Sequence, residues 1–274
     1  MSNYTVRSKV WLTVKPLVAF LIVGIISQFF GDIIRIVFEK IIEAFFSEKS
    51  SSIVYSRIVI NTISDITFII LYVFYYISKI KEIRKTSPLY THNNNKIVLG
   101  FLVSITSFGL MLLVSFTIRV TKLTELYEYE EYIKSYSFDY AFIHFVSTIL
   151  NAPIVEELCF RGLMLNYLLS ITKPKIAILI QAVLFGIIHI HFVQIIYSFV
   201  LGIVLGSLYL RFRNTGLCVI AHAAMNLPAF LVSSVPLIGN YEMTLTHILI
   251  IGVILSGVGG VFLINQPPAK IIYS

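Results

Sequence analysis

The sequence predicts an all-α, polytopic integral membrane protein with about eight transmembrane helices and a central polar cavity. Its 274 residues are 57% hydrophobic and only 13% charged, whereas soluble domains carry about 25% charged residues. The mean hydropathy is +0.88. The apolar runs are about as long as the 20 residues that a helix needs to cross the hydrocarbon core. They lack the alternation of apolar and polar residues that is typical of transmembrane strands.

The candidate spans follow one another along the whole chain. The first is interpreted as a retained anchor, because Lys15 and Pro16 break it early and no small-residue cleavage site follows. Residues 31–52 fit either an amphipathic surface helix or a continuation of the first span into water. Residues 79–96 predict a basic, Asn-rich inner loop, and residues 119–138 an acidic outer segment. The eight runs are about 10–30, 53–78, 97–118, 139–169, 174–190, 192–210, 215–233 and 245–264.

The distribution of basic residues predicts the orientation. With eight spans and the N-terminus inside, the inner loops carry Arg7, Lys9, Lys79, Lys81, Arg84, Lys85, Lys96, Lys173, Lys175, Arg211, Arg213 and Lys270. The outer loops carry Arg35, Lys40, Lys49, Arg119, Lys122 and Lys134. This bias follows the positive-inside rule, so both termini are predicted to be cytoplasmic in a multi-pass membrane protein. The compact, Ile-, Tyr- and Asn-rich chain is typical of prokaryotes, which predicts a bacterial cell membrane. The net charge of +7 is spread over these loops and does not indicate a nucleic-acid partner.

The chemistry is concentrated in the second half of the chain. We divide the single membrane domain into N-terminal helices and loops (1–138), a catalytic core (139–233) and a C-terminal helix (234–274). A charged side chain near the bilayer centre costs roughly 2.5–3.5 kcal/mol on insertion scales, so such residues are expected to pair, to line a cavity or to do chemistry. The polar residues inside the apolar runs of the core are Glu156, Glu157, Arg161, His189, His222 and Asn226.

Two adjacent glutamates are predicted to have different roles. Glu157 and Arg161 are four residues apart on one helix face, in the favourable order for an ion pair. Glu156 is rotated by about 100° from Glu157, so one arginine cannot easily serve both carboxylates. Glu156 is therefore the candidate general base acting on water, while Glu157 and Arg161 support the site.

The remaining polar residues leave two chemistries open. Phe185 precedes His189 by one helical turn, and His222 and Asn226 are also four residues apart. A His and an Asn side by side offer donors for an oxyanion. Alternatively, Glu156, His189 and His222 match a His₂Glu zinc set, although no HExxH motif supports this. The leading interpretation requires no cofactor, and a divalent metal such as zinc is the alternative.

Some polar and small residues outside these motifs receive structural interpretations. Asp65, in the middle of the second run, needs a hydroxyl or amide partner. Cys159 and Cys218 are expected to be small core residues. Six glycines are expected to allow close helix packing: Gly202, Gly206, Gly252, Gly257, Gly259 and Gly260.

Three ordered motifs resemble the Abi family of CAAX proteases and bacteriocin-processing enzymes, which includes the type II CAAX prenyl endopeptidases. The matching text is EELCFR at 156–161, FGIIH at 185–189 and HAAMN at 222–226. The resemblance implies an intramembrane endopeptidase with a conical cavity. It implies that Glu156 and His189 activate water and that His222 and Asn226 stabilise the oxyanion, with glutamate-centred and metal-dependent mechanisms both argued for the family.

The resemblance also implies a substrate class. We expect a hydrophobic peptide or a membrane protein as the substrate, the lipid bilayer as the surroundings, and a role in bacteriocin self-immunity or peptide maturation. One alternative is a non-catalytic immunity or scaffold protein that binds a peptide or a sensor kinase. Another is a transporter or proton relay, which would need inverted repeats or broken helices.

Overall fold

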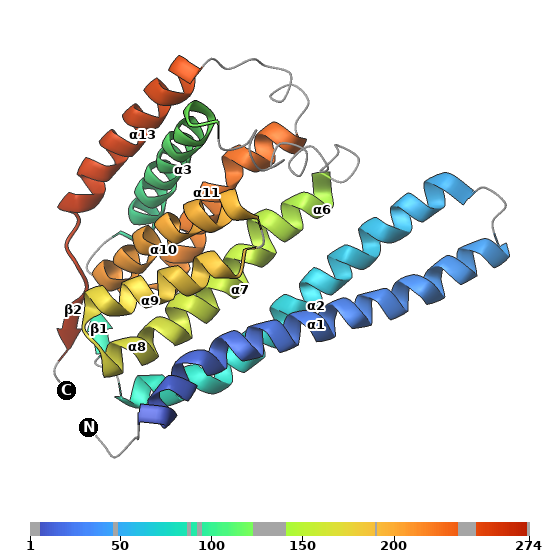
Figure 1. The fold of residues 1–274 in the computed structure, drawn as a ribbon, viewed down its shortest axis with the longest axis horizontal. Coiled ribbons are helices and arrows are strands. Elements are labelled where there is room, and N and C mark those ends of the chain that lie inside the picture. Colours follow the sequence, from blue (N-terminus) through green and yellow to red (C-terminus); the bar gives the residue numbers. More distant parts are fainter. Residues whose placement is uncertain are drawn as a thin grey trace.

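The computed structural model describes residues 6–45, 49–86, 89–91, 95–122, 141–189, 191–234 and 245–272. Within these ranges the chain forms eight successive helical segments, which confirms the all-α, polytopic class (Figure 1). Two shorter apolar helices, Pro174–Ile187 and Thr215–Leu231, accompany the longer ones. The helices long and apolar enough to cross a membrane are Thr13–Ile34, Thr62–Lys81, Lys96–Val120, Phe192–Phe212 and Thr246–Asn265. The predicted outer segment 119–138 lies mostly outside the described residues.

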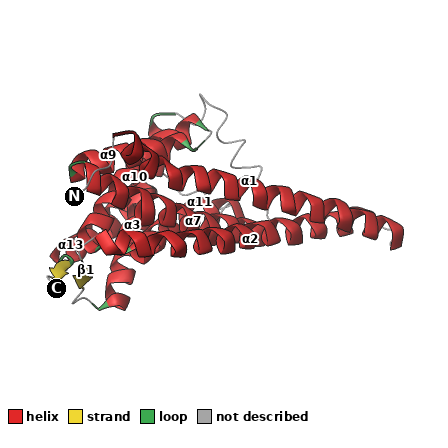
Figure 2. Cartoon of the chain, turned by 90° about the horizontal axis from the view of Figure 1, so that it is seen from below, coloured by secondary structure: helices red, strands yellow, loops and turns green. Residues whose placement is uncertain are grey.

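The first two helices form a long hairpin that extends beyond the rest of the molecule (Figures 1 and 2). Helix α1 (Val6–Phe45) runs past its apolar part without interruption, and α2 (Lys49–Thr86) returns beside it. Over residues 31–45 the continuation predicted as one alternative is therefore present, and the separate surface helix is wrong there; residues 46–48 lie outside the described residues, and 49–52 begin α2. Pro16 lies inside α1 and does not end it; its carbonyl accepts a hydrogen bond from Tyr72 Oη at 3.0 Å.

A small β-ribbon joins two distant parts of the chain at one end of the molecule. Strand β1 (Leu89–Thr91) pairs antiparallel with β2 (Lys270–Ile272). The expected loop at 79–96 is thus partly wrong, because α2 continues to Thr86 and a strand follows. The pairing brings the segment after the second helix beside the segment after the last one, which agrees with an even number of crossings. The cytoplasmic location of this end stays a prediction.

The fourth helical segment is interrupted by two π-helical turns. It consists of α6 (Ala141–Phe145), η2 (Val146–Asn151), α7 (Ala152–Glu157), η3 (Leu158–Met164) and α8 (Leu165–Ile171). The sequence predicted a single helix over 139–169. A π turn closes its hydrogen bonds one residue later than an α turn and occurs frequently at functional sites. Here the Ala152 N–H donates to the Ser147 carbonyl.

The interrupted segment packs against the N-terminal hairpin and three later helices, and two further helices pack outside these. Helix α3 (Lys96–Val120) packs against α13 (Leu245–Asn265) and α11 (Thr215–Ser234), and α9 (Pro174–Ile187) packs against α10 (Phe192–Phe212). One apolar core lies around η3 and a second lies between α3, α10 and α11. Cys159 and Cys218 are both fully buried free thiols, as predicted.

Four of the six glycines predicted to pack helices closely do so. A Cβ on Gly202 would lie 2.8 Å from the Ala182 Cα, and one on Gly206 would lie 2.8 Å from Gln181 Nε2. Gly252 and Gly259 make similar approaches between α13 and α3. The expectation is wrong for Gly257 and Gly260. Among the described residues, a Cβ on Gly257 would meet no atom within 4 Å, and one on Gly260 would lie 3.9 Å from the nearest atom, because both residues turn away from the tight contact.

Gly202→Ala is expected to destabilise the fold, whereas Gly257→Ala is not. The new methyl group of Gly202→Ala meets the backbone of α9, which cannot move aside as a flexible side chain can. Overpacking of this kind typically costs about 1–3 kcal/mol. The thermal unfolding midpoint in detergent measures the difference, and equal midpoints for the two variants would contradict this view of the α9–α10 contact.

Candidate active site

Three separate helical segments bring the predicted site residues together. Glu156, Glu157 and Arg161 come from α7 and η3, Phe185 from α9, and His222 and Asn226 from α11. The sequence predicted His189 to lie inside a helix, but it lies two residues beyond the end of α9 at Ile187. Its N–H donates to the Gly186 carbonyl at 3.0 Å in the turn that ends α9.

A fully buried ion pair forms the base of the site. Arg161 Nη1 donates to Glu157 Oε1 at 2.7 Å, and neither side chain is accessible. The same oxygen lies 2.9 Å from His222 Nδ1. The predicted pair is therefore present, and it extends to a histidine 65 residues away in the sequence. The Glu157 carboxylate is ionised in its pair with Arg161, and an ionised carboxylate can only accept hydrogen bonds. Nδ1 of His222 is therefore the donor in this contact and carries a proton.

The backbone of α10 and a glutamine complete the surroundings of Arg161. Arg161 Nη2 donates to the Gly202 carbonyl at 3.3 Å, and Gln181 Nε2 donates to the same oxygen at 2.7 Å. Gln181 is fully buried. Sequence reasoning missed it, although a lone amide inside an apolar run, four residues before Phe185, was a usable signal.

Glu156 has a different environment from its neighbour. Among the described residues, Oε2 of each glutamate is buried without a hydrogen-bond partner, but Glu157 is bonded through Oε1 whereas Glu156 makes no hydrogen bond at all. Glu156 Oε2 lies 4.0 Å from His222 Nε2, which is too long for a hydrogen bond. A buried carboxylate oxygen without a partner is costly, so Glu156 is poised to interact with a molecule that enters the site. The predicted difference between the two glutamates is thus visible in their contacts.

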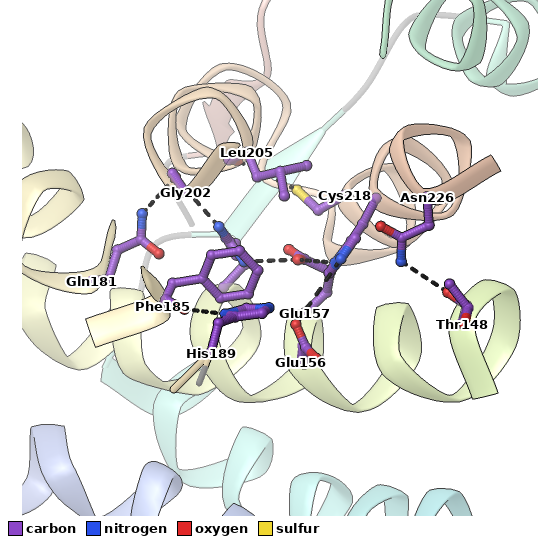
Figure 3. A network of polar contacts seen from close by, with 12 residues as sticks. Thr148, Glu156, Glu157, Gln181, Phe185, His189, Gly202, Leu205, Cys218 and Asn226 are labelled. Carbon is purple, nitrogen blue, oxygen red and sulfur yellow. Dashed lines mark hydrogen bonds and ion pairs between the residues drawn. The ribbon is translucent and has the colours of Figure 1, made fainter. Parts of the chain in front are cut away.

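The position of His189 determines which of its nitrogens is available. His189 Nδ1 lies 2.8 Å from the Phe185 carbonyl. A carbonyl only accepts, so Nδ1 is the protonated nitrogen, and Nε2 of the neutral ring presents a lone pair. In Figure 3 the free edge of the His189 ring faces Glu156.

Phe185 is the packing centre of the site. The His189 ring lies 5.2 Å and the His222 ring 5.7 Å from its ring, both in edge-to-face arrangements. The Arg161 guanidinium lies 4.5 Å from its centroid, within cation–π range. Phe185 is 1% exposed. Its contacts explain physically why an aromatic residue precedes His189 by one turn: the ring fixes both imidazoles and covers the ion pair.

Asn226 is held by the backbone of the first π turn. Its Nδ2 donates to the Thr148 carbonyl at 2.8 Å (Figure 3), which leaves the second N–H of the amide for another acceptor. Thr148 O would ordinarily accept from residue 153 in a π turn, but residue 153 is Pro153 and has no N–H. The sequence alone gave no signal for this contact.

Asn166 is a further polar residue that sequence reasoning missed. Its Nδ2 lies within hydrogen-bond distance of the Arg161 and Gly162 carbonyls and of Tyr209 Oη, at 3.1, 2.9 and 2.7 Å. The carbonyls belong to η3, whose hydrogen-bond pattern is shifted. Asn166 thus supports the π turn that carries Arg161.

The possible metal ligands were tested by their geometry. Both imidazoles hold their Nδ1 atoms in hydrogen bonds, as metal-binding histidines usually do. Among the described residues, however, no three His, Cys, Asp or Glu side chains are grouped closely enough to hold a metal ion. The described side chains are therefore not arranged as a His₂Glu ligand set.

The fold and the site define a polytopic helical membrane protein with a carboxylate, two imidazoles and an amide gathered between its helices. Residues 138–228 match the family described as "Type II CAAX prenyl endopeptidase Rce1-like". This segment contains all seven predicted site residues. The match confirms the family resemblance that the three motifs indicated.

A curated relative points to the same class of protein. A Bacillus subtilis (strain 168) protein named "Putative membrane peptidase YdiL" is 30% identical over 118 residues. The similar segment covers 43% of this chain and 46% of that protein. The chain therefore matches somewhat less than half the length of this relative. No solved structure gives a significant match.

Proposed function

We propose that this protein is an intramembrane endopeptidase that hydrolyses a peptide bond of a hydrophobic peptide or a membrane-associated protein. The observation that carries the proposal is the contrast between adjacent glutamates. Glu157 Oε1 is bonded to Arg161 and His222, whereas Glu156 makes no hydrogen bond among the described residues, and its Oε2 lies 4.0 Å from His222 Nε2. Hydrolysis needs a carboxylate that can bind and deprotonate water, and Glu156 fits this role because its carboxylate is not taken up by Arg161.

The geometry supports a water-activation step at Glu156 and His189. Glu156 takes a proton from water, and the available Nε2 of His189 accepts the other water hydrogen as a hydrogen bond. The hydroxide forms a bond to the carbonyl carbon, and the C=O π pair moves to oxygen. The C–N bond then breaks, and the proton held by Glu156 goes to the leaving amine. General-base assistance of this kind contributes roughly 10²–10⁴-fold.

The developing oxyanion is stabilised by His222 and Asn226. In its protonated form, His222 donates through Nδ1 to Glu157 and has its Nε2–H for the oxyanion. Asn226 has one amide N–H beyond the bond to Thr148 O. Removing one oxyanion donor commonly costs roughly 10²–10³-fold in rate. Arg161 and Phe185 keep the histidine oriented and do not take part in the proton transfers.

The biological role proposed is peptide maturation or bacteriocin self-immunity in a bacterial membrane, with both termini cytoplasmic. It rests on the family resemblance and on the location of the site between apolar helices, a location that suits an apolar substrate. A catalytically silent immunity or scaffold protein is the competing function. It predicts that site substitutions matter only when they unfold the protein.

Comparative peptidomics tests this function directly. Membranes from cells expressing the wild type or Glu156→Ala, at equal amounts of inserted protein, are compared for peptides and their new termini, with and without a chelator. Products present only with the wild type support the endopeptidase. Identical peptide sets, with immunity retained by Glu156→Ala, would support the scaffold instead. Products that disappear on chelation would show that a metal is required.

A further inference from the structure

Asp65 joins α2 to the π turn η2 through two hydrogen bonds. Ser147 Oγ donates to Asp65 Oδ2, and Asn151 Nδ2 donates to Asp65 Oδ1 at 2.7 Å. The sequence predicted a hydroxyl or an amide as the partner of this carboxylate in the middle of the second run, and both are present. Both carboxylate oxygens are therefore engaged by a single turn of the neighbouring segment.

The opposite side of the same turn contacts Asn226, the candidate donor to the oxyanion. Thr148 lies between Ser147 and Asn151, and its carbonyl accepts from Asn226 Nδ2 at 2.8 Å. Asn151 is the last residue of η2, and the α7 helix that follows carries Glu156. Asp65 on one side and Asn226 on the other thus hold η2 between α2 and α11.

We propose that Asp65 is a positioning residue for hydrolysis. By fixing the π register of η2, it directs the Thr148 carbonyl to Asn226 and sets the rotation of α7 and hence of Glu156. This inference rests on the proposed endopeptidase function. Asp65 itself contacts only η2 in these hydrogen bonds and acts through it.

The physical reason is the competition between π and α registers. π turns are rare, short insertions in α-helices, so this one depends on its surroundings. Without Asp65, the Ser147 and Asn151 side chains turn to nearby backbone groups, and the segment relaxes towards the α register. A change of one residue rotates the following helix by about 100°, which moves Glu156 away from His222.

The test compares Asp65→Ala with Asp65→Asn in the full-length protein. The asparagine has the same shape: its oxygen accepts from Asn151 and its amide donates to Ser147. The probe is a pool of internally quenched peptides of about 20 apolar residues with charged ends. Asp65→Ala is expected to lower kcat by about 10²-fold, as small misplacements can, with little change in KM, whereas Asp65→Asn keeps most of kcat.

Ser64→Ala is the matched control. Ser64 is a buried neighbour in α2 whose hydroxyl has no hydrogen-bond partner among the residues that the structure describes, so its loss is expected to leave kcat unchanged. An Asp65→Ala protein with wild-type kcat overturns the proposal while leaving the endopeptidase intact. An Asp65→Asn protein as impaired as Asp65→Ala also overturns it, because the charge and not the hydrogen bonding would then matter.

Amide hydrogen exchange supplies a readout that needs no cleavage. Asp65→Ala is expected to exchange faster than wild type over residues 146–157, and Asp65→Asn to resemble wild type. Unchanged exchange in Asp65→Ala overturns the positioning role. If the wild type cleaves none of the probes and Glu156→Ala leaves the membrane peptides unaltered, the endopeptidase function fails, and the exchange experiment decides the role of Asp65 in the turn separately.

Discussion

Glu156→Gln is expected to reduce peptide hydrolysis by about 10²–10⁴-fold, the usual contribution of a general base, without lowering stability. The Glu156 carboxylate makes no hydrogen bond within the described part of the chain, so an amide of the same shape loses no internal bond. The glutamine side chain, however, cannot take the proton from water. Initial rates with the quenched-peptide pool, together with unfolding midpoints in detergent, measure the two effects separately.

The adjacent glutamate provides the matched comparison for this result. Glu157→Gln keeps an oxygen for His222 but removes the charge paired with Arg161, so it is expected to lower the unfolding midpoint. A Glu156→Gln protein that retains wild-type rates would exclude Glu156 as the base. One that loses stability as much as Glu157→Gln would mean that Glu156 is a structural residue.

Arg161→Met is expected to be the most destabilising single change in the site. It leaves the Glu157 carboxylate buried without its cation, and breaking a buried pair in this way costs about 3–5 kcal/mol. It also removes the donor to the Gly202 carbonyl and the cation–π contact with Phe185. The yield of folded protein and the unfolding midpoint in detergent are the measurements.

The double variant Glu157→Gln/Arg161→Met distinguishes charge from shape. With both charges removed no unpaired ion is buried, so the double variant is expected to be more stable than Arg161→Met alone. Groups in direct contact show coupling of roughly 0.5–3 kcal/mol in double-mutant cycles. Strict additivity of the two single effects would contradict a stabilising pair between these residues.

Much of the fold follows from local sequence. Eight apolar runs predicted eight helical segments, and helices α3, α10 and α13 begin and end within a few residues of the predictions. The errors have local causes that apolar periodicity does not report. Helices α1 and α2 continue to Phe45 and Thr86, beyond the apolar runs, because a helix does not need apolar residues to form. The β1–β2 pair joins residues about 180 positions apart.

The residues of the candidate site were predicted from the sequence, but most of the hydrogen bonds between them were not. The i,i+4 spacing of Glu157 and Arg161 is enough to predict their ion pair, because both lie on one helical turn. Local spacing also predicted the contact of Phe185 with His189. It could not predict that Gln181 and Arg161 share the Gly202 carbonyl, because that contact depends on how α9 and α10 cross.

The sequence by itself determined which polar residues enter the apolar core, since burial of Glu156, His189 or His222 in a membrane segment is costly and therefore informative. Only the tertiary structure decided how they are paired. Helix packing places His222 against Glu157 Oε1 and leaves Glu156 without a hydrogen bond to any described residue. The hydrogen bonds of η2 to α2 and α11 likewise join segments about 80 residues apart, and no local pattern encodes contacts at that distance.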